Sequence, residues 1–272
     1  MLEESTTLTQ GMPDVQQSYD ARNIPIDKVG VRNIRYPITL RCPATQKLQH
    51  TVARINMYVH LSHEQKGTHM SRFLEVLNEH RHEIRYDQIR DVCRDIKQRL
   101  AAQEAHLELM FPYFIHKLAP VTRAPGMIDV EVTFECTLSE ARSDFLMGIK
   151  VPATSLYPCS KEISAYGAHN QRCEIEVRAS FGDGETMWIE ELFELVERSA
   201  SASVFAVLKR PDEKWVTEAA YDNPKFVEDI VRDLALQLDA EKRIRWYQAQ
   251  SENFESIHNH NAYAFIEREK QD

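Results

Sequence analysis

The chain has 272 residues, 43% hydrophobic and 28% charged, which is ordinary for a globular protein. Its formal net charge of −9 argues against nucleic-acid binding, because proteins that neutralise phosphate backbones carry a surplus of lysine and arginine. The five cysteines include no Cys-x-x-Cys pair, which favours a reducing compartment. The apolar runs are too short to span a bilayer, and the acidic start shows no secretory signal. These features predict a cytoplasmic protein with no membrane partner.

The first part of the chain predicts a polar arm followed by a module of strands and helices. Residues 1–25 are polar and form the predicted arm. From residue 26 to 140 the order is strand, strand, helix, helix, strand, strand. Alternating apolar residues mark a strand at 53–61, and apolar stripes mark the helices. The later elements are predicted at 70–80, 86–103, 105–117 and 127–138.

Residues 141–272 repeat the same order of elements without an obvious repeat of residues. Strands are predicted at 143–152, 171–182, 243–252 and 259–267, and helices at 186–199 and 223–240. The predicted fold class is therefore α+β, with two tandem ββααββ modules of antiparallel sheet and helices on one face. Long antiparallel strands leave sheet edges open, so we expect assembly into an oligomer.

Two polar segments depart from this pattern and carry candidate chemistry. Residues 155–172 hold Cys159 and His169, and thiolate and imidazole are the commonest ligands for zinc. Residues 251–265 hold Glu255, His258 and His260, with both histidines expected on one face of a strand. Carboxylate and imidazole together bind a metal or transfer a proton. The alternative interpretations are that Cys159 is a buried structural cysteine and His169 a surface histidine, and that residues 251–265 are a solvated strand end.

Three further segments are weak signals when taken singly. Residues 209–218, with Arg210 and Glu213, have the mixed charge of an exposed turn and could offer a carboxylate ligand and cations for phosphates. Residues 64–72 place Lys66, His69 and Arg72 around a helix start, where backbone N–H groups favour anions. Glu228 near another helix start is unremarkable by pattern.

Taken together and in order, the polar segments resemble the type IB GTP cyclohydrolases. The matching stretches are KGTHMSRF (66–73), PCSKEISAYGAHNQR (158–172), VLKRPDEK (207–214), NPKFVEDIVRD (223–233) and SENFESIHNH (251–260). The resemblance covers nearly the whole chain from Asp14 and implies a tunnelling fold, assembled as a homotetramer with active sites at subunit interfaces. The implied reaction opens the imidazole ring of GTP to give 7,8-dihydroneopterin triphosphate and formate, at the entry to folate and pterin biosynthesis.

The resemblance also implies roles for particular residues. His169, Glu213 and His258 match residues around a divalent metal such as Mn²⁺ or Zn²⁺, and Glu228 matches the carboxylate that anchors the guanine edge. Glu255 matches another acidic active-site residue, and His169 is the expected proton shuttle. The candidates for holding the triphosphate are Lys66, His69, Arg72 and Arg210.

One departure from the family pattern concerns the metal and the chemistry. The family reads Cys-Pro-Cys where this chain reads Tyr157-Pro158-Cys159, and a phenol cannot supply a soft thiolate. Either Cys159 substitutes as a ligand, or oxygen and nitrogen ligands alone hold Mn²⁺ or Fe²⁺. Further hypotheses are a paralogue in which Tyr157 contacts a modified guanine nucleotide such as 8-oxo-GTP, and an inactive subunit that binds nucleotide or pterin.

Overall fold

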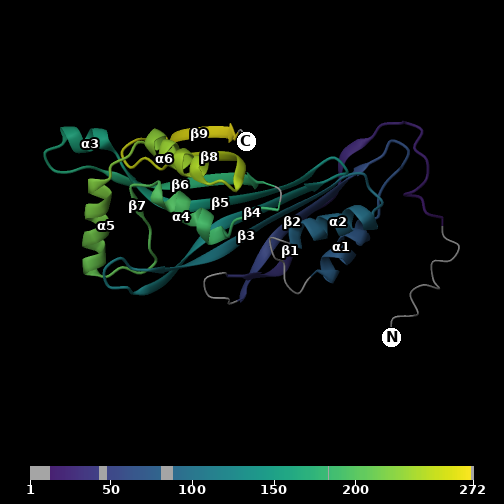
Figure 1. The fold of residues 1–272 in the computed structure, drawn as a ribbon, viewed down its shortest axis with the longest axis horizontal. Coiled ribbons are helices and arrows are strands. Elements are labelled where there is room, and N and C mark those ends of the chain that lie inside the picture. Colours follow the sequence, from purple (N-terminus) through teal and green to yellow (C-terminus); the bar gives the residue numbers. More distant parts are fainter. Residues whose placement is uncertain (1–12, 43–47, 81–87, 183, 271–272) are drawn as a thin grey trace.

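A single antiparallel sheet runs along the molecule. The computed structural model describes residues 13–42, 48–80, 88–182 and 184–270, and within them nine strands belong to one sheet. The strand order is β1-β2-β3-β4-β5-β6-β8-β9, and the short β7 pairs with the end of β5. Figure 1 shows an elongated molecule with the helices α1 and α2 at one end and α3 and α5 at the other.

The first half of the chain contains the predicted order of strands and helices. Its elements are β1 (Ile26–Arg41), β2 (Leu48–Leu61), α1 (Met70–Glu79), α2 (Ile89–Arg99), β3 (Ala105–Leu118) and β4 (Pro125–Leu138). The predicted start of the second helix near Tyr86 lies outside the described residues. α2 ends at Arg99, earlier than predicted, and Ala101 just after it has a positive φ of 49°, which a helix cannot continue.

The second half repeats the order with three additional elements. Its elements are β5 (Ser143–Leu156), α3 (Pro158–Ile163), β6 (Asn170–Phe181), α4 (Ile189–Arg198), β7 (Ala202–Ser203), α5 (Arg210–Asp222), α6 (Val227–Ala240), β8 (Ile244–Asn253) and β9 (Ala262–Glu269). The additions α3, β7 and α5 gather at the end of the molecule farthest from α1 and α2 (Figure 1). They surround the place where β5 ends.

The two halves share the sheet because β4 pairs with β5 across their junction. The pairing runs from Leu138 opposite Ser143 to Glu131 opposite Lys150. The second module therefore continues the sheet of the first. A division of the chain into domains at residues 140 and 141 stays a prediction.

One face of the sheet carries the hydrophobic core. A row of directly paired residues crosses β3, β4, β5, β6 and β8 and is buried throughout: Leu109, Phe134, Met147, Ala179 and Tyr247. Directly opposite residues share a face, so the whole row points the same way. The helices cover this face with the apolar stripes that the sequence predicts, which belong to the same buried cluster. The predicted α+β class with helices on one face of antiparallel strands is confirmed.

Three predicted local structures in the second half are wrong. Residues 209–218 were expected as an exposed turn, but they lie mostly in α5. The helix expected from Asn223 begins at Val227, because Asn223 instead donates its side-chain amide to the carbonyls of Ala200 and Ser201. The strand expected from residue 259 begins at Ala262, so His258 and His260 lie in the loop between β8 and β9.

Candidate functional site

Polar side chains meet where β5 ends, β6 begins and β8 ends. β5, β6 and β8 are neighbouring antiparallel strands, so the end of β5, the start of β6 and the end of β8 lie side by side. Tyr157 follows β5, His169 precedes β6, and Asn253 is the last residue of β8. The next residues of the β8–β9 loop bring Glu255 to the same place.

Tyr157 is at the centre of this cluster. Its ring centroid lies 5.7 Å from that of His169 and 5.7 Å from that of Phe226, the residue before α6. Its hydroxyl accepts a hydrogen bond from Asn253 Nδ2 at 3.2 Å. Burial and the neighbouring Glu255 carboxylate raise the pKa of Tyr157 above its ordinary value, with a smaller contribution from Glu228. Tyr157 is therefore a neutral phenol at physiological pH, suited to hydrogen bonding.

His169 is held through one ring nitrogen. Its Nδ1 lies 3.1 Å from Gln171 Oε1 and 3.1 Å from Ser256 Oγ. Gln171 is buried in β6, and Ser256 belongs to the β8–β9 loop. The imidazole is half-buried, and these contacts leave Nε2 available for a proton, a metal or a substrate.

Two carboxylates complete the cluster. The Oε2 atom of Glu255 is buried and has no hydrogen-bond partner among the described residues. A buried carboxylate oxygen without a partner is costly, so this atom is suited to accept a bond from a ligand that the isolated chain does not supply. Glu228 is exposed in the first turn of α6, near enough to affect the pKa of Tyr157.

The other residues expected around a metal lie apart from this arrangement. Cys159 is exposed on α3, and Glu213 is exposed on α5. His258 stacks on His260 with ring centroids 5.1 Å apart. The part of the chain that the structure describes contains no group of three His, Cys, Asp or Glu side chains placed to hold a metal ion. The ligand set of His169, Glu213, His258 and Cys159 stays a prediction.

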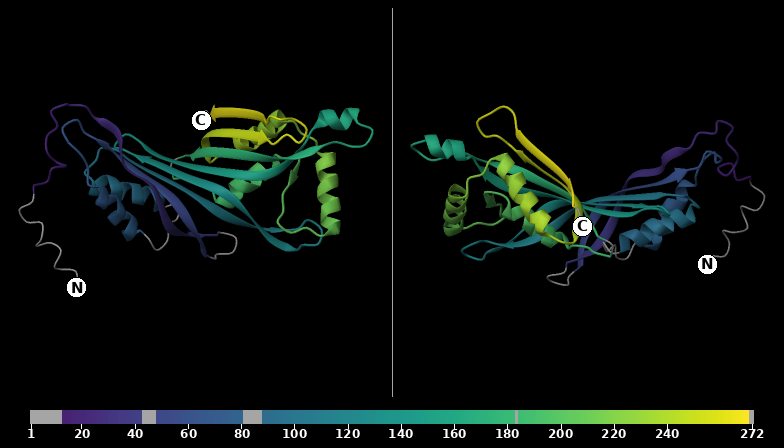
Figure 2. Two further views of the ribbon diagram at one scale, coloured as in Figure 1. Left: turned by 180° about the vertical axis from the view of Figure 1, so that it is seen from behind. Right: turned by 45° about the horizontal axis from the view of Figure 1, so that its top comes forward.

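The residues expected to hold triphosphate divide between two ends of the molecule. Arg210 is the first residue of α5, whereas Lys66, His69 and Arg72 lie around the start of α1. Figures 1 and 2 show α1 and α3 at opposite ends in every view. His69 is the residue before α1, and its Nε2 lies 3.1 Å from Asp14 Oδ2. One chain therefore does not bring Lys66, His69 and Arg72 to Tyr157.

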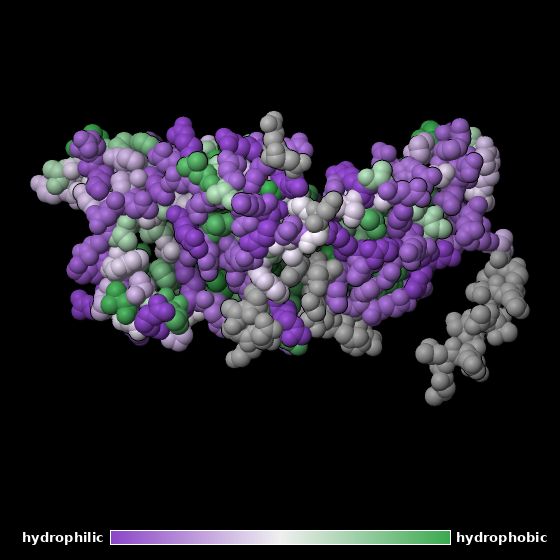
Figure 3. All heavy atoms as spheres, viewed as in Figure 1, coloured by the Kyte–Doolittle hydropathy of each residue, from purple (hydrophilic) through white to green (hydrophobic). Residues whose placement is uncertain are grey.

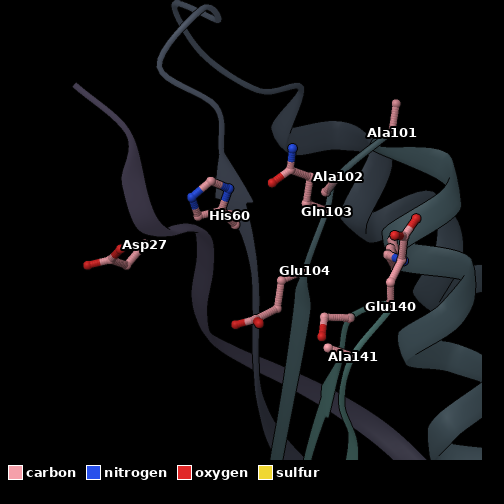
Figure 4. A pocket seen from close by; sticks show the side chains of 10 residues that line it. Asp27, His60, Ala101, Ala102, Gln103, Glu104, Glu140 and Ala141 are labelled. Carbon is pink, nitrogen blue, oxygen red and sulfur yellow. The ribbon is translucent and has the colours of Figure 1, made fainter. Parts of the chain in front are cut away.

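A hollow of about 730 Å³ lies at the α1–α2 end of the molecule (Figure 4). Asp27, Glu104 and Glu140 line it, with Lys97 as a positive charge. The surplus of carboxylates disfavours a triphosphate there, because like charges repel. None of the site residues expected from the sequence lines this hollow.

The sequence reasoning missed four buried polar residues beneath the cluster. Ser155, Gln171, Ser251 and Asn253 are buried at the ends of β5, β6 and β8. They occupy the inward positions of strands whose other inward residues are apolar. That signal was present in the sequence, since the alternation along 147–155 and 247–253 leads directly to these residues.

Comparison with known proteins gives a consistent family. The family model described as "Type I GTP cyclohydrolase folE2" matches residues 12–264. A protein of Magnetococcus marinus named GTP cyclohydrolase FolE2 is 56% identical, covering 94% of this chain and 96% of its own length. The GTP cyclohydrolase FolE2 of Geobacter sulfurreducens is 54% identical, covering 95% of this chain and 99% of its own.

Solved structures with a similar fold are much more distant in sequence. A uricase from Arthrobacter globiformis matches with a TM-score of 0.53 at 7% identity, covering 90% of this chain and 94% of its own. A uricase from Bacillus fastidious gives the same TM-score of 0.53 at 9% identity, with 90% and 94% covered. These likenesses support the tunnelling fold.

Proposed function

The chain belongs to the type I GTP cyclohydrolase FolE2 family, and on that premise we propose that it opens the imidazole ring of GTP. The products are 7,8-dihydroneopterin triphosphate and formate, at the entry to folate biosynthesis. We place it with the type IB enzymes and in the cytoplasm. No helix among the described residues is long and apolar enough to cross a membrane.

The observation that carries this proposal is the cluster around Tyr157. It combines the His169 imidazole, a buried oxygen of Glu255 without a partner, and Glu228 at a helix start. Ring opening at C8 of guanine requires addition of water and several proton transfers, for which an imidazole and a carboxylate are suitable groups. His169 moves protons, and Glu255 binds or orients what enters the site.

Glu228 is the proposed guanine-recognition residue. A carboxylate accepts the two parallel N–H groups on the N1 and N2 edge of guanine. Adenine presents an acceptor at N1, so it leaves the carboxylate without this pair of bonds. A site that depends on such a pair rejects the wrong base strongly, because a desolvated carboxylate is left unpaired.

We also propose a divalent metal beside His169 and Glu255. The donors there are the unpartnered carboxylate oxygen of Glu255 and the Nε2 atom of His169, which serves either as a metal ligand or as the proton carrier and not as both at once. Cys159, exposed on α3, is a further candidate ligand. Imidazole and carboxylate donors suit Mn²⁺, Fe²⁺ or Zn²⁺. Such an ion supplies an activated water when bound. His258 and Glu213 are the further candidate ligands, from the same chain or a neighbouring one.

The site is proposed to be completed by a second copy of the chain, within a homotetramer. Lys66, His69 and Arg72 lie around the start of α1 and Tyr157 directly precedes α3, and these two helices lie at opposite ends of the molecule (Figure 1). The edge strand β9 exposes Tyr263 and Phe265, which are 58% and 48% accessible. An open edge with exposed aromatic side chains is suited to pairing between chains.

Tyr157 supports a second candidate function. A neutral phenol donates a hydrogen bond, and a guanine nucleotide oxidised at C8 carries a carbonyl oxygen there that accepts one. The second candidate is therefore a paralogue that acts on 8-oxo-GTP. A subunit that binds guanine nucleotide or pterin without turnover is the third possible outcome of the same experiment.

The test incubates the metal-reconstituted protein with GTP and, separately, with 8-oxo-GTP. Formate release and fluorescence of the oxidised neopterin product from GTP support the main proposal. Turnover of 8-oxo-GTP alone supports the second candidate, and binding of GTP without turnover contradicts both. Metal content measured in parallel should fall in Glu255→Gln if Glu255 is a ligand. Tyr157→Cys should raise GTP turnover if the absent thiolate limits the reaction.

A further inference from the structure

A buried serine lies beneath both Tyr157 and His169 and contacts neither. Ser155 is the second-last residue of β5 and is fully buried. Its Oγ lies 3.2 Å from the carbonyl oxygen of Lys225, 3.4 Å from Gln171 Nε2 and 3.0 Å from Asn253 Nδ2. A buried hydroxyl with three polar neighbours has few ways to arrange its hydrogen bonds.

The carbonyl of Lys225 determines that arrangement. A carbonyl oxygen only accepts, so the single hydroxyl proton of Ser155 is donated to it. The Ser155 oxygen then has only its lone pairs left for its other two neighbours. Gln171 and Asn253 must therefore both present their amide N–H groups to Ser155.

This requirement fixes the protonated nitrogen of neutral His169. With its Nε2 donating to Ser155, Gln171 turns its Oε1 towards His169 Nδ1, 3.1 Å away. Two acceptors at that distance repel, so Nδ1 carries the proton and Nε2 carries the lone pair. Ser256 Oγ, 3.1 Å from the same Nδ1, accepts as well without changing this result.

The same serine directs the proton of Tyr157. Asn253 Oδ1 accepts from Ser251 Oγ at 3.2 Å, which leaves its Nδ2 to donate to both Ser155 and Tyr157. The phenol oxygen is thus an acceptor for Asn253, and its own proton is free for another partner. Glu255 is the carboxylate next to it.

We propose that Ser155 is a positioning residue that, through Gln171, holds His169 in the tautomer with its lone pair on Nε2 and, through Asn253, directs the Tyr157 hydroxyl towards Glu255. Its catalytic consequence rests on the proposed function, because His169 is the proton shuttle there. The hydrogen-bond directions themselves do not depend on which nucleotide the protein uses.

The primary test reads the tautomer directly by ¹⁵N NMR of the full-length protein labelled at histidine and freed of divalent metal by chelation. His169→Asn assigns the signal, and spectra are recorded at a pH at which that signal reports neutral imidazole. Wild type should show the Nδ1–H form. Finding mainly the Nε2–H form in wild type overturns the proposal, even if no variant folds.

The Ser155→Ala variant tests the origin of that preference. Without the serine oxygen the Gln171 amide can turn over, so the ratio of the two tautomers should fall about tenfold, the effect of one hydrogen bond of ordinary strength. Ser199→Ala is the matched control: Ser199 is also fully buried, donates to Leu195 and accepts from Gln237. It should leave the His169 signal unchanged.

A double variant separates positioning from simple destabilisation. A glutamate at 171 offers only acceptors, so Ser155→Ala combined with Gln171→Glu should restore the Nδ1–H form. An unchanged tautomer in Ser155→Ala, or no recovery in the double variant, overturns the proposal. For GTP turnover, Ser155→Ala should lower kcat about twofold and leave KM nearly unchanged, because a tenfold fall from a tautomer ratio of about ten leaves roughly half of His169 in the correct form. If wild type releases no formate from GTP, the proposed function fails, and the tautomer ratios still decide the role of Ser155.

Discussion

Asp212 is a buried carboxylate that ties α5 to the β3–β4 turn. It accepts hydrogen bonds from the backbone N–H groups of Val121, Thr122 and Lys209, at 2.8 to 2.9 Å, and from the Thr122 hydroxyl at 2.6 Å. Burial alone raises the pKa of a carboxyl group, but here these hydrogen bonds outweigh it and hold the pKa of Asp212 below its usual range. Its neighbour Glu213, predicted as a ligand, is exposed.

Asp212→Asn should therefore destabilise the protein in a pH-dependent way. A carboxyl group with a lowered folded pKa contributes stability above its unfolded pKa, and this stability is lost as the pH falls through the folded pKa. We expect the variant to lower Tm by a few degrees at pH 7, with a difference from wild type that shrinks below about pH 4. Thermal unfolding followed by circular dichroism measures this. The exposed Asp222, at the end of the same helix, provides Asp222→Asn as the control.

Tyr157→Phe tests the phenol separately from the ring. The ring contacts with His169 and Phe226 remain, while Asn253 loses an acceptor and Glu255 loses its neighbouring hydroxyl. We expect kcat for GTP to fall about tenfold with little change in Tm, since one hydrogen bond near the reacting groups is removed. Tyr221 is exposed on α5, so Tyr221→Phe should keep wild-type kinetics. Equal kcat values for Tyr157→Phe and wild type would show that the hydroxyl takes no part.

At the scale of secondary structure, three helices of the second half begin in the same way. An acidic side chain in the first turn accepts a hydrogen bond from the backbone N–H three residues earlier: Glu191 from Trp188, Asp212 from Lys209 and Asp229 from Phe226. This contact stabilises a helix start by satisfying an otherwise unpaired N–H. The mixed charge of residues 209–214 obscured it, so the sequence predicted a turn where α5 begins.

The sequence predicts an element best where the spacing of its hydrophobic residues determines whether it is a helix or a strand. It predicts least well where contacts with distant residues determine the local structure. Apolar stripes and alternation predicted both long helices of the first half and most strands, because burial of one face requires that spacing. The start of α6 depended on Asn223 binding carbonyls of a distant loop, which no local pattern reveals. Likewise the sequence identified the segments of Tyr157, His169 and Glu255, but not the Ser155 network that joins them.

Leu234→Ala and Leu236→Ala should separate the two faces of α6. Leu234 is fully buried against the sheet, whereas Leu236, on the same helix, is 69% exposed. Truncating the buried side chain should lower the free energy of unfolding by about 3 kcal/mol, and truncating the exposed one by less than about 0.5 kcal/mol. Chemical denaturation measures both. Similar losses in the two variants would mean that α6 does not pack as described.

At the scale of the whole molecule, the sheet has two unpaired edges, and some large apolar side chains are exposed at one end. β1 and β9 are the edge strands of the described sheet. Green, hydrophobic residues are scattered among hydrophilic ones on the surface at the end that carries α3 and α5 (Figure 3). The exposed large side chains there include Ile163, Tyr166 and Trp215. Exposed apolar residues and open edges favour association, and a symmetric oligomer satisfies both.

Complementation between variants tests whether a site is shared by two chains. A chain with Lys66→Ala and Arg72→Ala and a chain with Glu228→Ala should each be inactive alone. Co-expressed in equal amounts, they should recover about a quarter of wild-type activity, the fraction of two-chain sites in which both contributing ends are intact. Pairing Glu228→Ala with His169→Asn, both from one end, should recover none. No recovery in the first pair would mean that Lys66 and Arg72 do not complete the site of a neighbouring chain.

The pairing of β4 with β5 continues one hydrogen-bonded ladder through the middle of the elongated molecule. Because the ladder separates the two ends, Lys66 and Arg72 around the start of α1 lie away from the Tyr157 of the same chain. For the proposed two-chain site, turnover should depend on assembly: on dilution below the dissociation constant of the oligomer the rate per milligram of protein should fall, and adding back an inactive Glu228→Ala chain should partly restore it.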